Sequence, residues 1–221
     1  MKSARPDRDG AFRAPLGSAS CGRIVLVGGA SHLIIGADTA MDDLYLARFE
    51  EPAPAVRMEG STVAVRYPRL RSFDNSRREC PGEIVLSARV PWQIEFGGGV
   101  SRLAAGLCGL ELGFFEVKGG ASRVELTLPL PSGIVPVRVL DGASNVAVHR
   151  PEGVAARLRV SGGVTNLIFD EQHFGVVGDE VDLQTPGYDA SDCYDIAITG
   201  GANNLTVDEV RPDHSTFAGG D

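Results

Sequence analysis

Apolar and polar residues alternate along short stretches of this chain, and many of these stretches begin or end at glycine. After Gly119 and Gly120, for example, Val124, Leu126 and Leu128 alternate with polar residues. Alternation with a period of two is typical of a β-strand that buries one face. Paired glycines between such stretches indicate tight corners. The pattern therefore predicts many short strands joined at corners, which is an all-β fold.

The corner sequence recurs along the chain as Gly, then Ala or Val, then Ser, Thr or Asn, then a polar residue, then Leu or Val. Its copies begin at Gly29, Gly99, Gly120, Gly142, Gly163 and Gly201. Copies from Gly99 to Gly163 lie about 21 residues apart, a spacing typical of solenoid repeats, and the last interval is close to two periods. We therefore predict a single-domain, parallel β-helix-like β-solenoid, with one unmarked turn between the last two copies.

The alternation also predicts which side chains of each corner point inward. If Val124 and Leu126 are buried, Ser122 should be buried as well, because it lies two residues before Val124. The equivalent residues would then form an internal ladder of small polar side chains, namely Ser31, Ser101, Ser144, Thr165 and Asn203. Arg123 should face solvent, as should its counterparts His32, Arg102, Asn145, Asn166 and Asn204.

The pattern divides the chain into one domain with flanking segments. Residues 1–20 are polar and rich in Arg, Ala and Pro, so we expect a disordered tail. Residues 21–210 carry the strand pattern, interrupted by a basic, non-periodic stretch at 70–82 that we expect to be a mobile excursion. Residues 211–221 form a polar C-terminal tail. Trp92, the only tryptophan, is expected in the core or at an end cap.

Composition and charge narrow the functional classes. The chain has 28 glycines among 221 residues, 6% aromatic residues and a net charge of −8. A nucleic-acid-binding domain normally presents a basic face, so this balance argues against such a partner. The stretch from Asp170 to Asp221 is strongly acidic, whereas Arg69, Arg71, Arg77 and Arg78 form a basic run. That run is a candidate partner surface, although most charge runs are simply solvated.

The four cysteines give no metal or disulfide pattern. Cys21, Cys80, Cys108 and Cys193 are widely spaced, and no Cys-x-x-Cys pair or histidine cluster accompanies them. The sequence has no secretory-signal pattern and no apolar stretch long enough to span a membrane. We therefore expect reduced thiols and a cytoplasmic protein.

One acidic stretch offers candidate chemistry. Asp189, Asp192 and Asp195 could supply oxygen ligands to calcium, and Cys193 among them could act as a nucleophile. No histidine base lies in the same stretch, and a solvated loop explains the carboxylates equally well. We assign no catalytic residue, no resident metal and no cofactor.

Three stretches resemble one known group of domains. Residues 91–99 (PWQIEFGGG), 150–163 (RPEGVAARLRVSGG) and 185–198 (TPGYDASDCYDIAI) resemble the bacterial toast-rack and adhesin-like β-solenoid domains. Domains of this kind also form the C-terminus of LiaF-type envelope-stress proteins. The resemblance implies a β-solenoid without enzymatic activity, and it supplies no catalytic residue for this chain.

These observations lead to three functional hypotheses. The first is a non-enzymatic scaffold or interaction module, which binds a protein partner or associates with itself through its faces and ends. The second is a carbohydrate-binding or polysaccharide-processing β-solenoid, which would need a groove with carboxylates and exposed aromatic residues. The third is a regulatory, stress-sensing protein that contacts its partner through residues 1–20 or 70–82.

Overall fold

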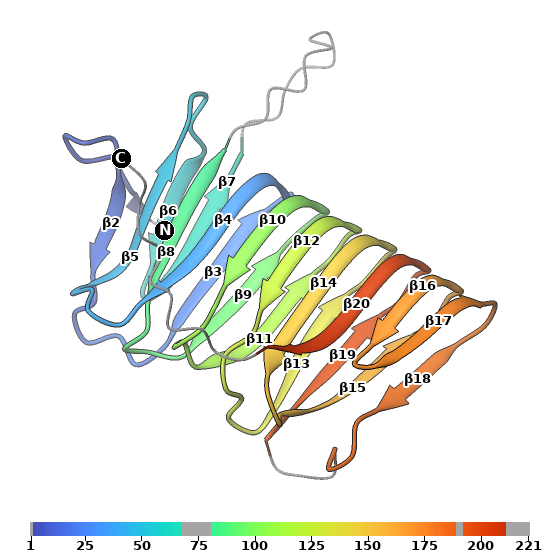
Figure 1. The fold of residues 1–221 in the computed structure, drawn as a ribbon. Helices are drawn as coiled ribbons and strands as arrows, with labels where there is room; N and C mark the ends of the chain where they lie inside the picture. Colours follow the sequence, from blue (N-terminus) through green and yellow to red (C-terminus); the bar gives the residue numbers. More distant parts are fainter. Residues whose placement is uncertain (1, 68–80, 189–191, 211–221) are drawn as a thin grey trace, which may run out of the picture.

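The computed structural model describes residues 2–67, 81–188 and 192–210, and every regular element among them is a β-strand. The strands form two ten-stranded sheets that lie face to face (Figure 1). The all-β prediction is confirmed. The described part of the chain contains no helix that could cross a membrane.

The first sheet contains the first strand of each rung together with its end strands. In spatial order, it comprises β1 (Lys2–Ser3), β6 (Ala55–Glu59), β7 (Thr62–Arg66), β3 (Gly22–Val27), β9 (Trp92–Phe96), β11 (Leu112–Val117), β13 (Ile134–Val139), β19 (Cys193–Ile198), β15 (Ala155–Val160) and β18 (Val181–Gln184).

The second sheet faces the first across the core. Its spatial order is β17 (Gln172–Val177), β16 (Val164–Phe169), β20 (Ala202–Val210), β14 (Ala143–Pro151), β12 (Ala121–Thr127), β10 (Val100–Gly106), β4 (Ala30–Asp38), β8 (Gly82–Ser87), β5 (Asp43–Phe49) and β2 (Phe12–Pro15).

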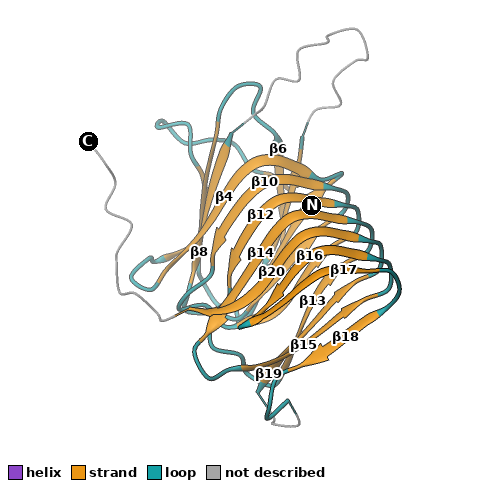
Figure 2. Ribbon diagram, turned by 45° about the vertical axis from the view of Figure 1, so that its right-hand side comes forward, coloured by secondary structure: helices purple, strands orange, loops and turns teal. Residues whose placement is uncertain are grey.

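The centre of each sheet is parallel, and both ends are closed by antiparallel strands. A strand of the first sheet, a glycine corner and the following strand of the second sheet make one rung, as in β9–β10 and β11–β12. Neighbouring rungs pair in parallel and in register, so that Val100 lies opposite Ala121, which lies opposite Ala143. The corners stack in a row along one side of the molecule (Figure 2).

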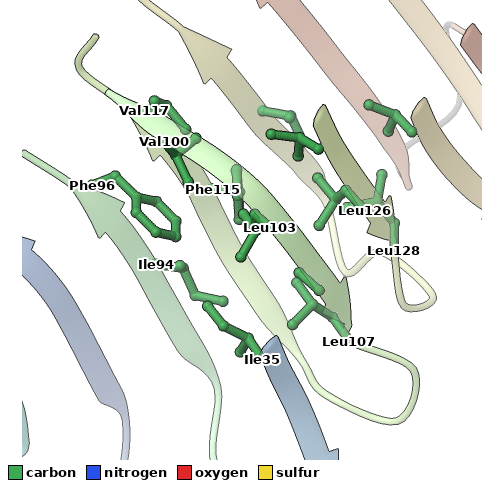
Figure 3. Close-up of a cluster of buried hydrophobic side chains, with 14 of the residues drawn as sticks. Ile35, Ile94, Phe96, Val100, Leu103, Leu107, Phe115, Val117, Leu126 and Leu128 are labelled. Carbon is green, nitrogen blue, oxygen red and sulfur yellow. The ribbon is translucent and has the colours of Figure 1, made fainter. Parts of the chain in front are cut away.

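The core fills the space between the two sheets. Ile94, Phe96 and Phe115 from the first sheet point toward Leu103 and Leu126 from the second (Figure 3). Alternate residues of each strand supply these side chains, as the period of two predicts. Trp92 is fully buried, as predicted for a core residue, and its indole N–H donates to the carbonyl of Ser87 at 2.8 Å.

The glycine corners are required mainly by close backbone packing. A Cβ added to Gly119 would lie 2.5 Å from the amide nitrogen of Gly99, and one added to Gly200 would lie 2.7 Å from that of Gly142. Neither glycine has a positive φ. A side chain at either position would therefore push neighbouring rungs apart, whatever backbone conformation it preferred.

Left-handed residues follow four positions after Gly119 and Gly200, and they overturn the predicted ladder of inward serines. Arg123 has φ 53°, and the equivalent residues His32, Arg102, Asn145, Asn166 and Asn204 have φ 51–58°. A left-handed residue breaks the alternation of an extended strand. Ala121 is consequently the buried side chain at 4% exposure, while Ser122 is only partly buried. The prediction that Arg123 and its counterparts face solvent is confirmed.

The order of rungs also differs from the order of the sequence. The rung β19–β20 lies between β13–β14 and β15–β16, so β20 pairs with both β14 and β16. Residues between the last two corner copies form β17 and β18, which are antiparallel to their neighbours. The prediction of one unmarked turn there was wrong, because those residues close the end of the stack instead.

The flanking segments differ in what the structure describes. Residues 1–20 contribute β1 and β2, contrary to the predicted disorder, because Ala11, Phe12 and Ala14 are buried against the end of the core. Residues 68–80, which include most of the predicted excursion, and residues 211–221 lie outside the described residues.

Candidate functional site

The two ends of the stack differ in how they protect their outermost strands. At one end, β1 is two residues long and β2 contains Pro15, which has no backbone N–H to offer. Arg13 on β2 forms an ion pair with Asp7 at 2.6 Å. Short strands, proline and charge are the usual means by which proteins prevent unwanted strand pairing.

The opposite end carries β17, which lacks these protections. This strand pairs with β16 on one side and with no other strand in the described part of the chain. Its sequence is Gln172-His173-Phe174-Gly175-Val176-Val177, with no proline and no Asp, Glu, Lys or Arg. Val176 is 79% exposed. An uncharged edge strand with an exposed β-branched residue is a template for pairing with another strand.

The neighbouring edge strand of the first sheet is different in character. On β18, Asp182 forms an ion pair with Arg157 of β15, and the Arg157 guanidinium lies 5.9 Å from the ring of Tyr188. The hydrogen bond from Arg157 holds the pKa of Asp182 below its usual value. The ion pair makes β18 a poor template for pairing with another strand. Of the two edge strands at this end, β17 is therefore the better template (Figure 1).

The outer face of the first sheet is occupied by ion pairs of the protein itself. Glu95 is only 7% exposed and contacts Arg23 at 2.5 Å and Lys118 at 2.6 Å. The hydrogen bond from Lys118 is the main reason that the pKa of Glu95 is lowered. These charges neutralise one another, so this face offers little to an external charged ligand.

The calcium candidates do not form a common site in the described residues. Asp189 lies outside them, and Asp192 accepts a hydrogen bond from the backbone N–H of Gly133 at 2.7 Å. Among the residues that the structure describes, no group of three or more His, Cys, Asp or Glu side chains could hold a metal ion.

Asp195, the third calcium candidate, is bound by two arginines. Its carboxylate lies 2.6 Å from Arg138 and 2.9 Å from Arg159. Burial alone would raise the pKa of Asp195, but the hydrogen bonds from the two arginines outweigh burial and lower it. Two guanidinium groups beside one carboxylate would repel a cation, so Asp195 acts as the centre of an ion-pair cluster.

The three cysteines that the structure describes are unpaired, and the candidate nucleophile lies in an unfavourable environment. Cys21, Cys108 and Cys193 are free, whereas Cys80 lies outside the described residues. Burial, followed by the charges of Asp195 and Asp192, raises the pKa of Cys193. A nucleophilic cysteine needs the opposite shift, because the thiolate is the reactive form.

One row of side chains on the second sheet has the residue types of a catalytic triad. Thr127, His149 and Asp208 lie opposite one another on adjacent strands, and His149 Nδ1 is 2.5 Å from Asp208 Oδ1. Within the described residues, no hydrogen bond joins the Thr127 hydroxyl to His149. A nucleophile is activated through such a contact with its base, so this row lacks the defining interaction.

Comparison with known proteins gives a structural match only. No family model matches this chain, and no curated protein matches it. A solved structure of a proposed cell adhesion protein from Clostridium sporogenes superposes with a TM-score of 0.68 at 16% sequence identity, covering 90% of this chain and 98% of that chain. At this identity the match shows a shared fold. It agrees with the adhesin-like fold expected from the sequence, while membership of the toast-rack family stays a prediction.

Sequence reasoning placed the candidate partner surface elsewhere. Arg69, Arg71, Arg77 and Arg78 lie outside the described residues, so that hypothesis stays untested. The edge position of β17 was missed because adjacency in the sheet depends on where β20 inserts. The uncharged run at 172–177, in an otherwise acidic stretch, was the only available signal.

Proposed function

We propose that this chain is a non-enzymatic interaction module that binds an extended segment of a protein partner along the free edge of β17. The proposal rests on a contrast between the edge strands. β17 has no proline and no Asp, Glu, Lys or Arg, whereas β1 is very short, β2 contains Pro15, and β18 carries an ion pair. Main-chain hydrogen bonds to an added strand would supply affinity, and the exposed Val176 would supply a side-chain contact.

Two further observations support the proposal. The structural neighbour from Clostridium sporogenes is described as a proposed cell adhesion protein, which is an interaction role. The charges on the outer face of the first sheet are neutralised by its own ion pairs, so that face is less available than the β17 edge. A second copy of this chain could serve as the partner, because its own β17 is a suitable strand.

The test uses hydrogen–deuterium exchange together with one charged variant. The amides of residues 172–177 that point away from β16 should exchange quickly in the isolated protein and become protected in the partner complex or the self-associated form. Val176→Lys should weaken the association at least about tenfold, because a charged side chain would meet the apolar contact of the added strand. Gly175→Lys should act in the same way, since a Cβ at Gly175 meets no atom within 4 Å.

Leu130→Lys is the matched control, because Leu130 is 72% exposed but belongs to the turn between β12 and β13. This variant should associate as the unmodified protein does. A complex that leaves residues 172–177 unprotected would contradict the proposal, as would equal loss of binding in the Leu130→Lys and Val176→Lys variants.

A further inference from the structure

The outer face of the second sheet carries a shallow groove beside the row of left-handed corner residues. Its volume is about 540 Å³, and His32, Arg102 and Arg123 form one side of it. Ile34, Ala104 and Ala147 form its floor. The groove lies on β4, β10, β12 and β14, away from the β17 edge, and so is independent of the function proposed above.

The fold places the three basic side chains at regular intervals. Ser31, Ser101 and Ser122 lie opposite one another on β4, β10 and β12, so the residues that follow them are also in line. All three of those residues have φ between 51° and 58°, and their side chains therefore leave the backbone in similar directions. Adjacent strands are about 4.8 Å apart, which sets the spacing of the row.

The row changes from basic side chains to asparagines between Arg123 and Asn145. Asn145, Asn204 and Asn166 continue the same line, but their amides bond to one another at 2.9 Å. The cationic half and the amide half are thus chemically distinct, although both have the same backbone conformation. His32, Arg102, Arg123 and Asn145 border the groove, whereas Asn166 and Asn204 do not line it.

The floor of the groove combines three apolar side chains with one carboxylate. Ala104 lies opposite Ile34 on one side and Glu125 on the other, and Glu125 lies opposite Ala147. Ile34 is 48% exposed, because none of the described elements covers this face of the sheet. Small side chains bordered by an exposed isoleucine can accept the flat face of a ring.

The position on a sheet face restricts the class of ligand. Backbone N–H and C=O groups of these central strands are already used in pairing with strands on both sides. An extended peptide lying here could not add main-chain hydrogen bonds to these strands, so strand addition cannot supply its affinity. A sugar chain carries its hydroxyl and carboxylate groups outward, and side chains alone can satisfy them.

We propose that this groove binds an acidic oligosaccharide, with uronate carboxylates on Arg102 and Arg123 and sugar rings on the floor formed by Ile34, Ala104 and Ala147. Guanidinium groups bind carboxylates through paired hydrogen bonds. Glu125 and Asn145 border the groove and can bond to hydroxyls. Because the net charge of the chain is −8, attraction of a polyanion here must come from these local cations.

The probe is an oligogalacturonate of several residues, with a neutral oligosaccharide of equal length as the comparison, measured by calorimetry. The acidic probe should bind and the neutral one should bind at least about tenfold more weakly. The Arg102→Asn/Arg123→Asn double variant should lose about tenfold or more in affinity. Asparagine occupies the same left-handed position at Asn145, Asn166 and Asn204, so the corner should be retained.

Two control variants separate charge from shape. Arg123→Lys keeps the charge but loses the paired hydrogen bonds, so it should bind more weakly than the unmodified protein and more tightly than Arg123→Asn. Ala147→Phe leaves the charge unchanged but fills the floor, and should weaken binding of the probe. Val176→Lys, on the β17 edge, should bind the probe normally, so failure of the edge proposal and failure of this one can be told apart.

Three results would overturn the assignment. The first is no binding of the acidic probe by the full chain, and the second is unchanged binding by the Arg102→Asn/Arg123→Asn variant. The third is tighter binding of polyglutamate than of oligogalacturonate, which would point to an acidic peptide as the ligand of the groove.

Discussion

The side-chain amide of Asn204 donates a hydrogen bond to the side-chain oxygen of Asn145 at 2.9 Å, although the two residues are far apart in the chain. Both occupy the same left-handed position in neighbouring rungs, with φ 53° and 54°. One corner geometry therefore serves two purposes: it turns the chain from one sheet to the other, and it aligns side chains across rungs.

Substitutions at Asn204 should separate the backbone effect from the side-chain effect. Asn204→Gly keeps the left-handed conformation and loses the amide bonds, whereas Asn204→Val also forces a β-branched residue into that conformation. We expect Asn204→Val to be less stable than Asn204→Gly by about 1–2 kcal/mol in urea unfolding. Thr206→Val, an extended position on the same strand, should have little effect. Equal stabilities of the two Asn204 variants would mean that the corner tolerates any residue.

Gly22 packs directly against the indole ring of Trp92. A Cβ at Gly22 would lie 2.7 Å from three ring atoms of Trp92, which is itself fully buried. Gly22→Ala should therefore displace the ring and destabilise the protein by about 1–3 kcal/mol. Because Trp92 is the only tryptophan, its fluorescence should change as well.

Gly36→Ala on β4 provides the comparison for Gly22→Ala, because a Cβ at Gly36 meets no atom within 4 Å. We expect unchanged fluorescence and little loss of stability for this variant. If both variants were equally destabilised, a general cost of losing glycine from a strand would explain the result, and contact with the indole would not.

The ion-pair cluster around Asp195 should make stability depend on pH. The pKa of Asp195 is lowered in the folded protein, because the hydrogen bonds from Arg138 and Arg159 outweigh burial. A carboxyl with a lowered pKa stabilises the fold above its unfolded-state pKa, near 4, and loses this contribution as the pH falls through its folded-state value. Asp195→Asn should thus cost about 2 kcal/mol at pH 7, and the cost should shrink below about pH 4.

The comparison for Asp195→Asn is Glu125→Gln, which removes an exposed carboxylate of β12. The difference in unfolding free energy between this variant and the unmodified protein should be small at every pH. A cost of Asp195→Asn that stayed constant from pH 7 to pH 3 would argue against the cluster as its source.

Two buried tyrosines differ in one interaction. The hydroxyl of Tyr194 donates to the carbonyl of Pro129 at 2.6 Å, whereas the hydroxyl of Tyr45 has no hydrogen-bond partner in the described part of the chain. Both side chains are fully buried. Removing a satisfied hydroxyl costs about 1 kcal/mol, while removing an unsatisfied one recovers its desolvation penalty.

Tyr194→Phe should consequently lower the free energy of unfolding by about 1 kcal/mol, and Tyr45→Phe should raise it by a similar amount. Thermal or urea unfolding of the two variants in parallel measures both effects. Destabilisation by Tyr45→Phe would show that its hydroxyl has a partner, such as an ordered water molecule, in solution.

The sequence predicted the type of element better than the arrangement of elements. Alternation around Leu126 and the repeated corners predicted short strands joined at corners, because a period of two is a local property of the chain. Ser122 was misplaced because one left-handed residue, Arg123, shifts the phase, and non-glycine residues rarely adopt that conformation. The β17 edge could not be predicted, because it depends on pairing between segments far apart in the sequence.

For the candidate sites too, the sequence showed local patterns but not which residues are neighbours in space. The row formed by His32, Arg102 and Arg123 was visible as equivalent solvent-facing positions of the repeated corner, but the groove beside it depends on which outward residues are small. Asp195 looked like a metal ligand because its sequence neighbours are acidic. Its actual neighbours, Arg138 and Arg159, come from adjacent strands that sequence proximity does not reveal.

The central position of β19 and β20 has a consequence for how the chain acquires its fold. In an ordinary linear repeat each unit docks on the one before it, so folding can follow synthesis from one end to the other. Here β15 and β16 are made before the strands that separate them from β13 and β14. The rungs β13–β14 and β15–β16 therefore cannot reach their final positions until residues 193–210 have been synthesised and can insert between them. Any earlier pairing between these two rungs must first be broken. Loss of this late segment would open the middle of the stack rather than shorten its end.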